Sequence, residues 1–164
     1  MGELYLIAVL DDVSQARLAA LSDELTARGF EYTHLVPFHI TLAGPDTPLD
    51  TMREHIESVC AATPAFDIGI GHVGLFGLAV LFLAPLPSEP LLTLERNLLG
   101  RINDAPDGWV PHVTMRMGEP EYIERAVPIL ARSFEPFTAR IERVEMYETG
   151  EGYANFVRKF EFGR

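Results

Sequence analysis

The chain has 164 residues and is short of cysteine, of cationic side chains and of long apolar segments. Cys60 is the only cysteine, which excludes an intrachain disulfide framework and a cysteine-based zinc site. Its surroundings have helical spacing, so we expect a small buried apolar side chain there.

Long hydrophobic segments are also missing. The apolar run Leu4 to Leu10 is too short to span a membrane, and it ends at Asp11-Asp12. It has neither a basic leader nor a small-residue cleavage site, and Leu6 stands where a myristoylation signal needs Ser or Thr. The expectation is a cytoplasmic protein without membrane association.

Cations are few. The chain has 13 Lys and Arg against 24 Asp and Glu, a net charge of −11, so its surface should repel long duplex nucleic acid. A locally placed arginine can still hold one phosphate. Apolar residues make up 48% of the chain and mean hydropathy is +0.10, which is typical of a folded globular protein. We expect one domain over residues 1–164.

What the chain does have is the pattern His-x-Thr twice, as His39-Ile40-Thr41 and as His112-Val113-Thr114. Each copy lies in a short apolar segment that is expected to be a strand. Because side chains alternate between the faces of a strand, the imidazole and the hydroxyl of each copy share one face. Two such strands facing each other would place two imidazoles across one cleft.

Periodicity and turn residues predict the other elements around these motifs. Strands are expected at 4–10, 66–76, 78–83, 138–148 and 153–162, the last two joined through Gly150-Glu151-Gly152. Helices are expected from Asp12 or Ser14 to before Gly29, from Asp50 to before Pro64, at about 90–102, and at about 121–133 with a possible kink at Pro128. Residues 104–108 are expected to form a turn-rich loop.

This order contains a repeat. The succession strand, helix, motif strand, helix, strand runs from Leu4 to about Phe76 and again from Leu78 to Glu148, which gives expected lobes of about 4–76 and 78–162. His39 lies 35 positions after Leu4, and His112 lies 34 positions after Leu78. We therefore predict a two-lobed, duplicated α+β domain, with antiparallel sheets around a central cleft and helices outside. The two motifs should meet on its pseudo-twofold axis.

Two simpler interpretations of the motifs remain open. Both histidines can be structural, and a metal site of His39, His112 and a carboxylate is possible, although no third ligand stands at a recognised spacing. Of the other histidines, His34 is expected in a loop, His55 on a solvated helix face, and His72 on a strand without a partner.

The double motif resembles that of the two-histidine (2H) phosphoesterase superfamily, which includes 2′-5′ RNA ligase-like proteins and cyclic nucleotide phosphodiesterases. The resemblance covers nearly the whole chain. It implies that His39 and His112 are an acid–base pair and that Thr41 and Thr114 hydrogen-bond the phosphate. It implies neither metal nor organic cofactor.

The chain departs from that pattern at two positions. Phe38, with Pro37 before it, stands where the family often has proline, and Met117 stands where many ligase-like members have arginine. Arg116 is one position earlier; on a regular strand it shares the His112 face and could reach an anionic substrate. Three aromatic residues are candidates to stack on a base, or are core residues: Phe38, Phe76 and Tyr153.

The predicted activity is hydrolysis of a 2′,3′-cyclic phosphate of a nucleotide or an RNA end, with ligation as the reverse reaction. Two imidazoles can activate water and protonate the departing ribose oxygen when one is neutral and the other is charged. Two alternatives belong to other classes: a non-catalytic module that binds nucleotides or RNA ends, and an interaction domain whose acidic surface recruits a basic partner.

Overall fold

The computed structural model describes residues 2–100 and 108–163. The strands are β1 (Glu3–Leu10), β2 (His39–Ala43), β3 (Phe66–Phe76), β4 (Val80–Pro85), β5 (Val113–Met117), β6 (Phe137–Gly150) and β7 (Tyr153–Glu161). The helices are α1 (Asp12–Ala27), the 3-10 turn η1 (Leu49–Met52), α2 (Arg53–Ala61), α3 (Glu89–Leu99) and α4 (Pro120–Ser133). The α+β class and antiparallel pairing are confirmed.

All seven strands belong to one sheet, in the order β2-β1-β6-β3-β4-β5, with β7 also paired to β6. The long strand β6 connects its two parts: β1 lies along one edge, while β3 and β7 follow one another along the other. The last strand of each sequence repeat therefore pairs with the first strand of the other repeat, β3 with β4 and β6 with β1. The two sequence repeats are therefore interlocked through the sheet, and one domain with lobes at about 4–76 and 78–162 stays a prediction.

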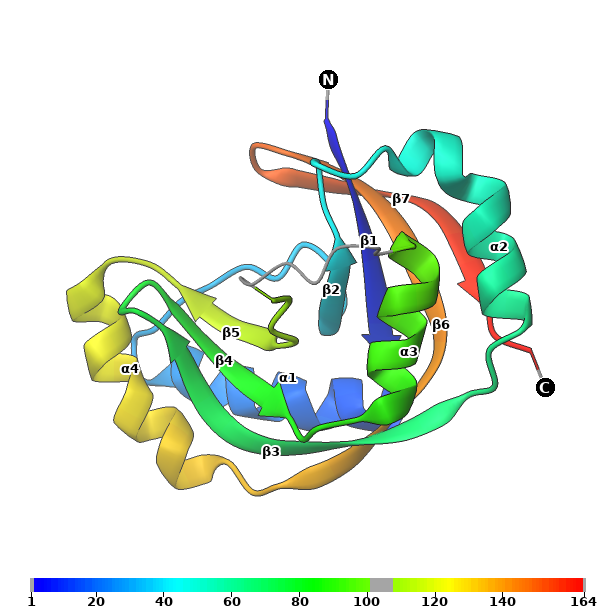
Figure 1. Cartoon of the computed structure of the whole chain (residues 1–164). Helices are drawn as coiled ribbons and strands as arrows, with labels where there is room; N and C mark the ends of the chain where they lie inside the picture. Colours follow the sequence, from blue (N-terminus) through cyan, green and yellow to red (C-terminus); the bar gives the residue numbers. More distant parts are fainter. Residues whose placement is uncertain (1, 101–107, 164) are drawn as a thin grey trace.

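The helices pack against this curved sheet in two pairs, α1 with α4 and α2 with α3 (Figure 1). α1 packs against α4 and β6, whereas α2 packs against α3 and β7. The edge strands β2 and β5 contact each other in the middle of the molecule. β2 carries the first His-x-Thr motif, and β5 carries Thr114 of the second motif, whose His112 directly precedes the strand. The topology therefore brings the two motifs together.

Most predicted elements are confirmed within a few residues, and the exceptions are at helix ends. Asp11, not Asp12 or Ser14, caps α1. The expected helix from Asp50 begins as the 3-10 turn η1, and α3 ends at Leu99, with Gly100 in the left-handed conformation (φ 54°). α4 continues through Pro128. The expected helix end at Ile102 and the loop residues 104–107 lie outside the described residues.

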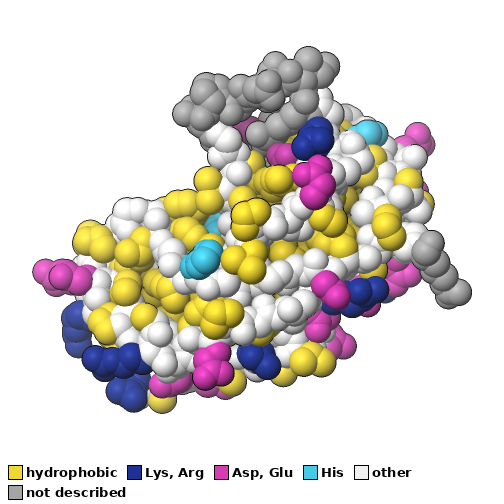
Figure 2. All heavy atoms as spheres, turned by 60° about the horizontal axis from the view of Figure 1, so that its bottom comes forward, with side chains coloured by type: hydrophobic (Ala, Val, Ile, Leu, Met, Phe, Trp, Pro, Cys, Tyr) yellow, Lys and Arg dark blue, Asp and Glu magenta, His cyan; other side chains and the backbone are white. Residues whose placement is uncertain are grey.

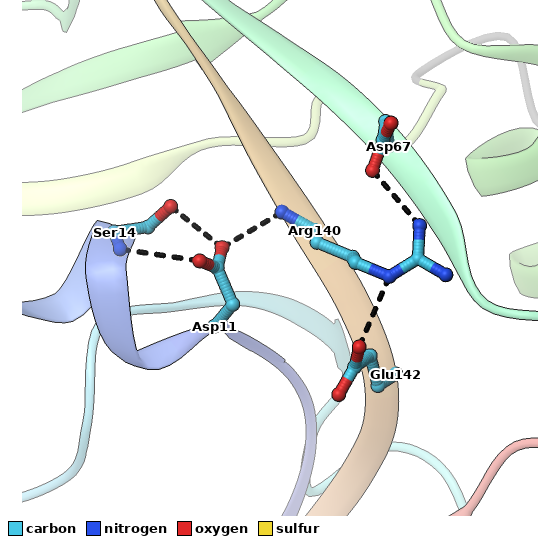
Figure 3. Close-up of polar contacts among 5 residues, drawn as sticks. All are labelled: Asp11, Ser14, Asp67, Arg140 and Glu142. Carbon is cyan, nitrogen blue, oxygen red and sulfur yellow. Dashed lines mark hydrogen bonds and ion pairs between the residues drawn. The ribbon is translucent and has the colours of Figure 1, made fainter.

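The first turn of α1 is attached to β6 through the Asp11 carboxylate (Figure 3). It accepts hydrogen bonds from the Ser14 hydroxyl at 2.6 Å and from the Arg140 backbone N–H at 2.8 Å. The Arg140 side chain in turn forms ion pairs with Asp67 on β3 and Glu142 on β6, each at 3.0 Å. The Asp11 carboxylate caps the helix by accepting from its first turn, where N–H groups are otherwise unpaired. Since it also binds Arg140, it holds the start of α1 at the point where β3 and β6 meet.

The continuous apolar run of β1 reflects burial on both faces. Leu6, Ala8 and Leu10 belong to the main core under the helices. Ile7 and Val9 belong to a second cluster with Tyr147 on the opposite face. That opposite face also carries the candidate site. Within the described part of the chain, no helix has the length and apolar character needed to cross a membrane; the cytoplasmic location stays a prediction.

Candidate active site

The two motifs show the alternation that the sequence predicts. Ile40 and Leu42 on β2, and Val113 and Met115 on β5, are buried in the main core. The intervening side chains, those of the four motif residues, are partly exposed on the other face: His39, Thr41, His112 and Thr114. An imidazole and a hydroxyl therefore lie together on each side.

Both imidazoles are held in the same way. Nδ1 of His39 lies 2.7 Å from the carbonyl oxygen of Pro37, and Nδ1 of His112 lies 2.9 Å from that of Val110. A carbonyl can only accept, so in each ring Nδ1 carries the proton and donates it. In the neutral ring, Nε2 is then the nitrogen with the free lone pair, which can take a proton from a substrate or a water.

A cavity of about 440 Å³ opens beside the first motif. His39 and both motif threonines, Thr41 and Thr114, line it, as do the candidate aromatic residues Phe38 and Tyr153. His112, the residue before β5, is not among the lining residues; its ring lies 4.7 Å from that of Phe76 and 5.3 Å from that of Phe82. A volume of this size is in the range of small-molecule sites.

Tyrosine dominates the wall of this cavity. Four of the five tyrosines of the chain line it: Tyr5, Tyr32, Tyr147 and Tyr153. The Tyr147 hydroxyl donates to Glu145 Oε1 at 3.0 Å, and burial together with that carboxylate raises the pKa of Tyr147 to about 12. Tyr147 therefore stays protonated at any physiological pH. The wall offers flat aromatic surface and neutral hydroxyl groups.

The environment of His39 favours its neutral form. Desolvation by burial lowers its pKa, and the positive charge of His112 lowers it further, although the bond to Pro37 opposes both effects. A neutral imidazole with Nε2 free is the form that a general base needs.

Arg116 does not lie on the His112 face, so that expectation is wrong. Thr114 pairs with Phe82 and Arg116 pairs with Leu81, which leaves Met115 as an extra residue in β5. This bulge turns Arg116 to the core side, where it is 0% exposed. In this structure its guanidinium therefore cannot reach a substrate.

The buried guanidinium instead joins three segments. It donates to the carbonyl oxygens of Phe30 at 3.0 Å and Ser22 at 2.7 Å, and to the hydroxyls of Ser22 at 3.0 Å and Thr26 at 3.2 Å. α1, the loop after it and β5 are thereby tied together. The loop leads directly to His39, so the position of Arg116 still bears on the site.

The sequence missed three further residues around the motifs. His34, expected only as a loop residue, lines the cavity, with its ring 4.5 Å from that of Phe38. Trp109 donates its Nε1–H to the carbonyl oxygen of Thr41 at 2.9 Å, which connects the segment before the second motif to the strand of the first. Gln15 binds the backbone of Phe38. The sequence offered a hint for His34 only, because it is one of five histidines and therefore a candidate for acid–base chemistry. Nothing in the sequence pattern pointed to Trp109 or Gln15.

One face of the molecule has histidine side chains at its centre with hydrophobic side chains around them (Figure 2). Among the exposed apolar residues, Leu35, Met117 and Tyr153 line the cavity and Phe76 lies against the ring of His112. Among residues 2–100 and 108–163, no three His, Cys, Asp or Glu side chains are grouped so that they could hold a metal ion.

Comparison with known proteins agrees with this architecture. A crystal structure of TT0787 from Thermus thermophilus superimposes with a TM-score of 0.65 at 19% identity, over 99% of both chains. E. coli LigT in complex with 3′-AMP gives 0.61 at 16% identity, over 99% of this chain and 98% of LigT. A crystal structure of a phosphoesterase gives 0.62 at 14% identity over the whole of both chains. At such identities these similarities show the fold.

No curated protein matches the chain in sequence. The model of the 2′-5′ RNA ligase superfamily, however, matches residues 10–152, which include both motifs and every element from α1 to β6. With this match over most of its length, and with the fold of LigT, the chain belongs to the 2′-5′ RNA ligase superfamily.

Proposed function

We propose that this protein is a metal-independent phosphodiesterase that opens 2′,3′-cyclic phosphates of nucleotides or RNA ends. The observation that carries this proposal is the matched pair of imidazoles, each with Nδ1 bound to a carbonyl two residues earlier and each beside a threonine on the cavity face. Membership of a superfamily of ligases and phosphoesterases supports the enzyme class. The 3′-AMP bound by LigT supports a nucleotide as ligand.

In the proposed reaction, His39 is the base and His112 the acid. Nε2 of His39 takes a proton from water as the water oxygen bonds to phosphorus. The bond between phosphorus and one ribose oxygen breaks, and His112 gives its proton to that oxygen. The hydroxyls of Thr41 and Thr114 donate to the non-bridging oxygens, where negative charge builds. The lowered pKa of His39 supports its assignment as the base.

Ligation is the corresponding reaction with a ribose hydroxyl in place of water. His39 takes the proton of that hydroxyl as its oxygen bonds to phosphorus, and His112 gives a proton to the ribose oxygen whose bond to phosphorus breaks, so each imidazole keeps its role. The tyrosine-rich wall supports a bound base beside the phosphate, because aromatic side chains stack on nucleobases.

The test is turnover of 2′,3′-cyclic mononucleotides and of cyclic-phosphate-ended RNA by the native protein, His39→Ala and His112→Ala. Each variant should lose about a thousandfold or more in kcat, the scale of a general acid or base. The control is His72→Ala, an exposed position on β3, which should keep native activity. EDTA should have no effect.

Full activity in either motif variant would overturn the proposal, and loss of activity in EDTA would favour the metal alternative. Calorimetry that finds tight nucleotide binding without turnover by the native protein would identify a non-catalytic binding module instead.

A further inference from the structure

Gln15, the only glutamine of the chain, pairs with the backbone of the residue immediately before His39. Its Oε1 accepts the N–H of Phe38 at 2.9 Å. Its Nε2 donates to the carbonyl oxygens of Phe38 at 2.7 Å and of Leu10 at 3.1 Å. The side-chain amide thus imitates a neighbouring strand at the point where β2 begins.

One of these bonds leads directly to His39. The N–H of Phe38 belongs to the same peptide group as the carbonyl of Pro37, and that carbonyl accepts the Nδ1–H of His39 at 2.7 Å. A peptide group is planar, so a bond that fixes its N–H also fixes the direction of its C=O. Hydrogen bonds linked in this way polarise one another, which strengthens the bond to the imidazole.

The second motif lacks the backbone N–H that such a series of hydrogen bonds requires. The carbonyl of Val110 accepts from His112, but the next residue is Pro111, whose nitrogen carries no hydrogen. Phe38 occupies the corresponding position in the first motif. The difference between Phe38 and Pro111 therefore gives only His39 a peptide N–H through which another residue can act.

Gln15 is itself held firmly. It lies in the first turn of α1, and its backbone N–H donates to the carbonyl of Asp11 at 2.9 Å. The Asp11 carboxylate attaches this turn to Ser14 and to the backbone of Arg140 on β6 (Figure 3). The amide is thus presented to Phe38 from a fixed element rather than from a flexible loop.

We propose that Gln15 is a positioning residue for His39: through the peptide between Pro37 and Phe38 it holds the imidazole in the tautomer and orientation that leave Nε2 free toward the cavity. The kinetic consequence rests on the proposed function. The hydrogen-bond chain and its effect on the tautomer do not depend on it.

The decisive variant is Gln15→Met, which preserves the length of the side chain and removes its hydrogen bonds. We expect kcat for a 2′,3′-cyclic mononucleotide to fall about tenfold while KM changes less than about twofold, as for other residues that orient an imidazole. Nitrogen-15 NMR of the imidazoles at about pH 7.5 should show His39 as the Nδ1–H tautomer in the native protein and as a mixture in the variant.

Two further variants separate positioning from folding. Gln15→Glu keeps an acceptor for the N–H of Phe38, so its kcat should be about three times that of Gln15→Met. Ala16→Met places the same new side chain at the next, exposed position of α1 and should match the native protein in both readouts. Native thermal stability in Ala16→Met would show that methionine is tolerated on this turn.

A Gln15→Met protein with native kcat and an unchanged His39 tautomer would overturn the inference. If the native protein turns over no cyclic phosphate, the proposed function fails, and the nitrogen-15 spectra still decide the role of Gln15. Equal loss of kcat in Gln15→Glu and Gln15→Met, with the tautomer unchanged in both, would also contradict it.

Discussion

At the scale of single residues, burial gives His34 an acid–base behaviour that its loop position does not suggest. Desolvation is the main cause, and the charges of Arg116 and His39 add to it, so that the pKa of His34 falls from 6.5 to about 4. Its Nε2 lies 3.4 Å from Nη1 of Arg116, an arrangement that suits only a neutral ring. His34 is therefore uncharged at neutral pH.

This shift predicts a loss of stability on acidification. As pH falls below about 6.5 the unfolded chain binds a proton at His34 before the folded protein does, so the free energy of unfolding decreases until about pH 4. Well above the unfolded pKa, neither state binds the proton and the group has no effect. In His34→Phe the fall in Tm between about pH 7.5 and about pH 5 should be smaller than in the native protein by roughly 3 °C.

The measurement is thermal unfolding followed by circular dichroism at both pH values. His72→Phe, on the exposed side of β3, is the matched control and should follow the native protein. Parallel curves for His34→Phe and the native protein would show that the burial of His34 does not control its protonation.

At the scale of elements, Arg116 is the connection between β5, α1 and the loop that leads to His39. Substitution by methionine leaves the carbonyl of Phe30 and the hydroxyl of Ser22 without their donors. Hydrogen bonds to a charged group contribute about 1.5–3 kcal/mol each, and unpaired buried acceptors add a cost. We expect Arg116→Met to lower the free energy of unfolding by about 3 kcal/mol.

Urea denaturation with an unchanged m-value would measure this loss. Arg132→Met, at an exposed position of α4, makes the same replacement and should change stability by less than about 0.5 kcal/mol. A loss in Arg116→Met no larger than in Arg132→Met would contradict the role given to the guanidinium.

The elements also mark what could be predicted from the sequence. Apolar periodicity was enough for the helices and strands, and for the shared face of His39 and Thr41, because those patterns are regular. The bulge at Met115 breaks the alternation, so the side of β5 on which Arg116 lies could not be deduced. Gln15 looked like any polar residue of a first helical turn, since its partner Phe38 is 23 positions away.

At the scale of the whole molecule, the exchange of strands makes one site from two sequence repeats. β3 and β6 each pair with the first strand of the other repeat, so neither repeat completes its part of the sheet alone. This arrangement brings the edge strands β2 and β5 into contact. The two imidazoles are bound alike, each to the carbonyl two residues earlier, and the residues between them and those carbonyls differ, Phe38 in the first motif and Pro111 in the second.

The net charge of the whole molecule predicts how kcat/KM depends on salt for substrates of different charge. At −11 the protein repels polyanions, and salt screens that repulsion. For an RNA of about ten nucleotides with a cyclic-phosphate end, kcat/KM should therefore rise about threefold between roughly 20 and 200 mM KCl. A cyclic mononucleotide, with one charge, should change by less than about twofold over the same range.

Steady-state kinetics over this salt range, with both substrates and the same enzyme preparation, makes the comparison. Ordinary nucleic-acid binding shows the opposite trend, because salt competes with the release of counterions from the phosphates. A fall in kcat/KM for the RNA as salt rises would mean that local cations near the site outweigh the repulsion by the whole surface. A rise confined to the RNA would show that long-range repulsion by the acidic surface limits the length of RNA that the protein can use.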